Sequence, residues 1–132
     1  MDEDISSLSA ILLNEDYYSF LLHGRIRVDE ITVLDVPYLI PFKAKAWIDL
    51  SDKKAAGESV DSKNIRKHKN DVFRLTELLD ENQARLPFIP DTVRNDMRMF
   101  VERMADEAVD LKQLGILDKT KEAILEQLME IY

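Results

Sequence analysis

The chain has no cysteine, only three glycines and only four prolines. Without cysteine it has neither a disulfide framework nor a thiolate zinc site, and because this suits a reducing compartment we expect it in the cytoplasm. Three glycines are too few for the Gly-rich loops that cradle phosphates, and neither phosphate-binding fingerprint occurs. The G-x-S-x-G elbow and the zinc motif H-E-x-x-H are missing as well. The sequence therefore excludes the enzyme classes that these particular motifs identify.

Long hydrophobic runs are also missing. The chain begins with Met1-Asp2-Glu3-Asp4, which is acidic where a secretory signal is basic. The longest nearly uncharged stretch, 31–42, is too short to span a bilayer and includes an aspartate and two prolines. We therefore expect neither export nor a membrane-spanning helix.

Charge is distributed unevenly along the chain. The 18 basic and 26 acidic residues give a net charge of -8, so the molecule as a whole should repel nucleic acid and anionic lipid. The segment 43–74 is the exception, with nine Lys and Arg against five Asp and Glu. An anionic ligand would be drawn to that segment.

Hydrophobic periodicity predicts an α+β fold that is mostly helical, with a small N-terminal β-hairpin. The whole chain, 1–132, has the size of one domain with its own core. Residues 5–13 fit either a strand end or a buried helix, 51–59 form a loop, and 86–90 form a proline-bounded linker. The other predicted elements are a helix from Asn14 to His23, a hairpin over 26–33 turning at Asp29-Glu30, and helices from Asp35 to about Ser51, over 62–80, from Asp91 and after Asp118.

Apolar stripes identify the helix faces that should be buried. The stripes of the last two helices are Val93, Met97, Phe100 and Met104, and Leu117, Ile124, Leu128 and Ile131. A two-stranded hairpin is only marginally stable in water. Either the helices cover it, or neighbouring strands come from a part of the protein outside this chain.

Lys43 is the first candidate for a functional side chain. On its predicted helix it shares a face with Leu39, Ala46 and Leu50, so its stem runs inside an apolar stripe. One interpretation is a lysine whose ammonium reaches water at the edge of the core. The other is a cation that projects into a cleft, where phosphate would be its natural partner.

The second candidate is the basic run on the helix predicted over 62–80. Lys67, Asp71 and Arg74 are spaced i, i+4 and i+7, so that two cations can flank Asp71 on one face. Ordinary ion pairs on a solvated helix face would give the same pattern. His68 lies on the apolar stripe of this helix, where a core-edge histidine is more common than a ligand. With His23 as the only other histidine, a multi-histidine metal site is excluded.

Three segments together resemble the C-terminal half of AbiEii-type nucleotidyltransferase-like proteins, a bacterial, toxin–antitoxin-like family. They are SSLSAILL at 6–13, YLIPFKAKAWIDL at 38–50 and DSKNIRKHKNDVFRL at 61–75, and the resemblance covers residues 5–80. Members of that family have a catalytic part with a Gly-Ser motif and aspartates that hold magnesium. A helical part follows, with one helix that carries K-x-x-A and another that carries K-x-D-x-x-D-L.

The resemblance implies roles for particular residues. Lys43 with Ala46 matches the first helix motif and Asp71 matches the first aspartate of the second, whereas Arg74 stands where the family has its second aspartate. Lys43 would contact nucleotide phosphates, and Asp71 would orient that lysine or a substrate. With Lys67, these residues form the predicted nucleotide-phosphate site, and we assign no catalytic residue and no metal ligand.

A complete family member would use magnesium, but this sequence has no Gly-Ser motif. Metal ions make the largest contribution to catalysis of nucleotidyl transfer. We therefore expect this chain to be an inactive nucleotidyltransferase-like fragment that by itself binds no cofactor. The alternative is a helical protein–protein interaction module without a ligand site. A nucleic-acid binder is less favoured, because the net charge opposes it. A second copy or a partner chain would cover SAILL, residues 9–13, and the edge of the hairpin.

Overall fold

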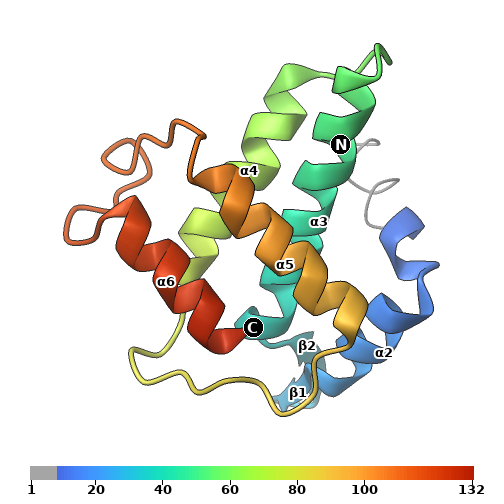
Figure 1. Cartoon of the computed structure of the whole chain (residues 1–132). Helices are drawn as coiled ribbons and strands as arrows, with labels where there is room; N and C mark the ends of the chain where they lie inside the picture. The colour runs from blue at the N-terminus through green and yellow to red at the C-terminus, as the bar shows by residue number, and fades with distance from the viewer. Residues whose placement is uncertain (1–8) are drawn as a thin grey trace.

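A computed structural model describes residues 9–132 and confirms a mostly helical α+β fold with a small antiparallel sheet near the N-terminus (Figure 1). Residues 9–12 are helical, which favours the helical alternative for that part of 5–13, while 5–8 lie outside the described residues. The further elements are α2 (Glu15–His23), β1 (Arg25–Val28), β2 (Ile31–Leu34), α3 (Val36–Ala55), α4 (Ser62–Thr76), α5 (Asp91–Met104) and α6 (Lys121–Ile131).

The hairpin forms as predicted and turns at Asp29 and Glu30. Val28 pairs with Ile31 across this two-residue turn, and both turn residues have positive φ, 50° and 67°. A two-residue hairpin favours this left-handed conformation because it matches the twist of the strands, although glycine and asparagine adopt it more readily. Just before β1, a Cβ at Gly24 would lie 2.4 Å from the Cβ of Tyr38, so glycine is required there.

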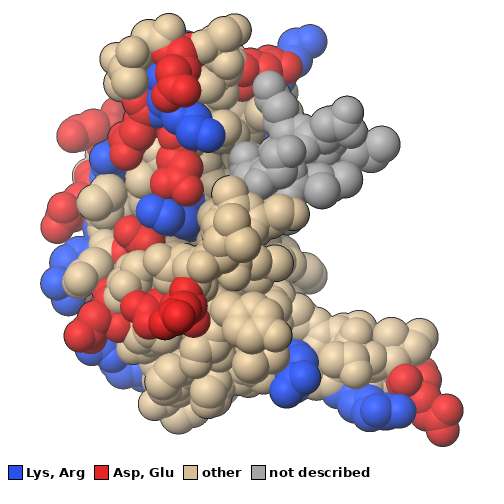
Figure 2. Space-filling model, turned by 90° about the vertical axis from the view of Figure 1, so that its right-hand side faces the viewer, with Lys and Arg blue, Asp and Glu red and all other residues tan. Residues whose placement is uncertain are grey.

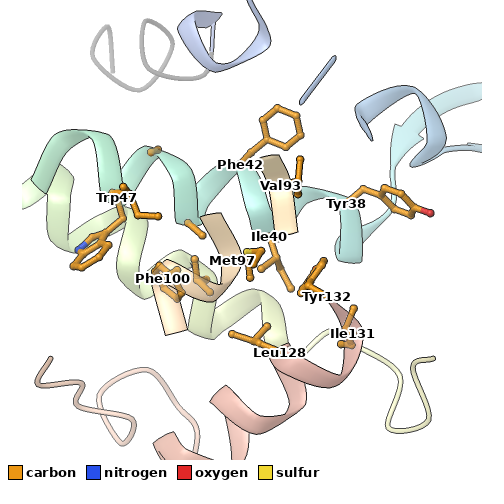
Figure 3. Packing of buried hydrophobic residues seen from close by; sticks show 14 of the residues in the cluster. Tyr38, Ile40, Phe42, Trp47, Val93, Met97, Phe100, Leu128, Ile131 and Tyr132 are labelled. Atoms are coloured by element: carbon orange, nitrogen blue, oxygen red, sulfur yellow. The ribbon is translucent and has the colours of Figure 1, made fainter. Parts of the chain in front are cut away.

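The four long helices enclose the core. α3 and α4 lie side by side with opposite directions, α5 crosses them, and α6 packs against α5 (Figure 1). The predicted stripe of α5 is confirmed, because Val93, Met97, Phe100 and Met104 are all fully buried. Figure 3 shows Met97 and Phe100 between side chains of α3 and α6. None of the helices within 9–132 has the length and apolar character needed to cross a membrane.

Several predicted helix ends are wrong. α3 continues to Ala55 through half of the predicted loop, because no glycine or proline lies between Ser51 and Gly57, where φ is +89°. The helix predicted over 62–80 ends at Thr76. Asp91 is the first residue of α5 rather than its cap, and the cap position is Pro90, which makes no side-chain hydrogen bond.

The prediction for Leu117 is also wrong, since its side chain is 79% exposed. α6 begins only at Lys121, after its cap Thr120, so the helical period does not extend back to Leu117. The other three members of that stripe are fully buried. The linker 86–90 is irregular as predicted, yet Leu86 and Ile89 are buried in the core and hold it in place.

Candidate functional site

The centre of the candidate site is an ion pair between α3 and α4. The Nζ of Lys43 lies 3.2 Å from Oδ2 of Asp71, and their side chains are only 16% and 20% exposed. Partial burial strengthens such a pair, because fewer water molecules screen the two charges. The interaction joins the two helices at the positions that the family resemblance singles out.

Arg74 contributes a second cation to the same carboxylate. Its Nη1 lies 3.6 Å from the other oxygen of Asp71, and its side chain is 54% exposed. At that exposure the pair contributes little to stability, so its guanidinium remains available to a ligand. The structure thus confirms that a cation flanks Asp71 at i+3, whereas a nearer cation, Lys43, comes from another helix. Lys67 is exposed on α4.

The arrangement leaves positive charge at the α3–α4 seam, by which we mean Lys43, Asp71 and Arg74. Two cations share one carboxylate, so a net charge of about +1 remains. The ammonium of Lys43 has three donors, and one contact with Asp71 leaves others that can reach an acceptor. Asp71 also restricts the position of the ammonium. Helical periodicity alone did not predict this carboxylate partner of Lys43, whereas the family resemblance implied that Asp71 orients the lysine or a substrate.

His68 is fully buried, as expected of a core-edge histidine. Among residues 9–132, no group of three or more His, Asp or Glu side chains comes close enough to hold a metal ion.

Sequence reasoning missed a partly buried polar network at the other side of α3. The hydroxyl of Tyr17 on α2 donates to Oδ2 of Asp96 on α5 at 2.7 Å, and the Nζ of Lys45 lies 3.7 Å from the same oxygen. Burial, followed by the negative charge of Asp96, raises the pKa of Tyr17 far above its ordinary value. No local sequence pattern predicts this network, because its members come from three helices that only the fold brings together.

Comparison with known proteins adds no relative. No family model, no curated protein and no solved structure matches this chain.

Proposed function

We propose that the α3–α4 seam is the phosphate-facing surface of a nucleotidyltransferase-like protein. The observation that carries the proposal is the ion pair of Lys43 with Asp71. These are the two positions that match the lysine and aspartate motifs of AbiEii-type proteins, and they come from separate helices. A phosphate could accept hydrogen bonds from Lys43 and from the exposed Arg74 at the same surface.

Phosphate contacts of this kind position a nucleotide but do not replace a metal centre. Magnesium ions neutralise the charge of a triphosphate and align the attacking group. The resemblance implies that such ions are held by a Gly-Ser motif and its aspartates, which do not occur in this sequence. The seam by itself would therefore bind nucleotides weakly and transfer nothing.

The test is an NMR titration of the whole chain with a nucleoside triphosphate. Signals near Lys43 and Asp71 should shift with a dissociation constant of roughly 0.1–1 mM, which corresponds to about 4–5.5 kcal/mol. Lys43→Met retains the apolar stem and deletes the charge, so it should abolish the shifts while the amide spectrum stays folded.

Lys63→Met is the control, because Lys63 is exposed on α4, the helix of Asp71, and lies outside the seam. It should leave the titration unchanged. Equal shifts in wild type and Lys43→Met, or no shifts near Asp71 at all, would contradict the phosphate role.

One observation favours the second candidate, a protein–protein interaction module. Register places the four apolar residues of the hairpin on one face, because directly paired residues point to the same side. They are exposed: Ile26 43%, Val28 50%, Ile31 65% and Val33 39%. Figure 2 shows the hairpin as an arm projecting from the body, and the surface above it carries few charged side chains. Exposed apolar surface of this kind is typical of a binding face.

If a second copy of the chain covers this face, the protein should self-associate. Sedimentation equilibrium should then show dimers at high concentration, and Ile31→Lys should shift the equilibrium to monomers, since it places a charge at the most exposed of the four apolar side chains. Leu117→Lys is the control, because Leu117 is 79% exposed and lies outside the hairpin, in the segment before α6. A wild-type chain that stays monomeric would rule out a second copy as the partner.

A further inference from the structure

A pocket of about 550 Å³ lies beside the C-terminal half of α3. Its volume is within the range of small-molecule sites. α3 supplies Trp47, Ser51 and Lys54 to the wall, α4 supplies Ser62, Arg66 and Lys69, and Glu107 closes it from the segment after α5. Both triplets have the spacing i, i+4, i+7, so each lies on one face of its helix.

The indole of Trp47 provides a buried donor at this pocket. Trp47 is only 5% exposed, and its Nε1 has no hydrogen-bond partner within the described part of the chain. In Figure 3 the indole nitrogen lies on the side of the ring toward the C-terminal end of α3, where Ser51 and Lys54 line the pocket. A buried N–H without an acceptor is unfavourable, and an oxygen atom of a ligand would satisfy it.

The charges of the pocket favour an anion. Its one carboxylate, Glu107, is already paired with the Nζ of Lys69 at 3.2 Å. Lys54 donates to the hydroxyl of Ser62, and across residues 9–132 no carboxylate forms an ion pair with Lys54 or Arg66. Ser62 is the first residue of the 15-residue helix α4, whose N-terminal dipole adds positive potential.

We propose that this pocket binds a small organic phosphate. The phosphate oxygens would accept hydrogen bonds from the guanidinium of Arg66, the ammonium of Lys54 and the indole N–H of Trp47. Guanidinium is suited to this task because it can contact two phosphate oxygens at once. The apolar part of the ligand lies against the ring of Trp47 and the side chains of Ile65 and Ala55, which also line the wall.

This site is separate from the α3–α4 seam. Neither Lys43 nor Asp71 lines the pocket. Arg66 and Asp71 point in directions roughly 140° apart around the axis of α4, because successive helical residues are rotated by about 100°. The two proposals can therefore succeed or fail independently.

The only tryptophan in the chain reports on this pocket directly. Phenyl phosphate is a suitable probe, since it combines a phosphomonoester with an aromatic ring. During a titration at low salt, the single indole N–H signal in a ¹H–¹⁵N spectrum should move downfield and the tryptophan fluorescence should change. Arg66→Gln should weaken binding about tenfold or more, because it removes the charge and the bidentate contact.

Two variants and one ligand serve as controls. In Lys63→Gln, at an exposed lysine on the same turn of α4, and in Lys43→Met, in the seam, phenyl phosphate should move the indole signal of Trp47 as it does in wild type. Phenol, which has the ring without the phosphate, should leave the indole signal in place. The proposal is overturned if phenyl phosphate does not move the indole signal, if phenol moves it equally, or if Arg66→Gln binds as well as wild type.

Discussion

Phe100→Ala should lower the free energy of unfolding by about 3–5 kcal/mol, a large share of the roughly 5–15 kcal/mol that stabilises a domain. Phe100 is fully buried where α5 crosses α3. Its ring meets that of Trp47 edge to face, with 5.6 Å between the centroids and 86° between the planes. Truncation would leave a cavity between rigid helices that cannot close around it.

Urea unfolding followed by circular dichroism measures this loss. Met99→Ala is the matched control, because Met99 is the preceding residue of α5 and is 38% exposed. Met99→Ala should lower the free energy of unfolding far less than Phe100→Ala does. Similar losses in the two variants would mean that the crossing of α5 over α3 is not where the core derives its stability.

Alkaline pH should destabilise the protein steeply. Burial and then the charge of Asp96 raise the pKa of Tyr17, and burial raises the pKa of Tyr132 well above its ordinary value. Both side chains keep their protons in the folded chain, while an unfolded tyrosine loses its proton above about pH 10. This stabilising contribution is complete below pH 10 and is lost as the pH rises beyond it.

Each such tyrosine lowers the free energy of unfolding by about 1.4 kcal/mol per pH unit above 10, so the pair gives about 2.7 kcal/mol per unit. Urea unfolding between about pH 9 and 12 tests this, with tyrosinate absorbance as a second signal. Tyr17→Phe should be destabilised at neutral pH, because Asp96 loses its hydroxyl donor, and its stability should fall less steeply with pH. Tyr18→Phe, at a tyrosine that is 53% exposed, is the control. If Tyr17→Phe leaves the fall of stability with pH unchanged, the buried hydroxyl of Tyr17 is not a source of the alkaline destabilisation.

The sequence by itself determined the class of fold and the position of its local elements. The stripe of Val93, Met97, Phe100 and Met104 predicted the buried face of α5, because an amphipathic helix carries that information within one segment. Alternating residues on both sides of Asp29-Glu30 predicted the hairpin in the same way. Helix ends were less predictable. The predictions for the end of α3 and for Leu117 were wrong. Helix propensity changes gradually along the sequence, whereas a helix begins and ends at a particular capping residue.

Only the tertiary structure decided which side chains meet. The periodic spacing of the basic run placed Asp71 beside Arg74, since both are on α4, but Lys43 on α3 lies nearer to Asp71 than Arg74 does. The pocket at Trp47 likewise combines faces of α3 and α4 with Glu107, which follows α5. Spacing along one helix fixes which residues share a face, while the crossing of helices fixes which faces meet. That crossing depends on the packing of the whole core, which no single segment of the sequence contains.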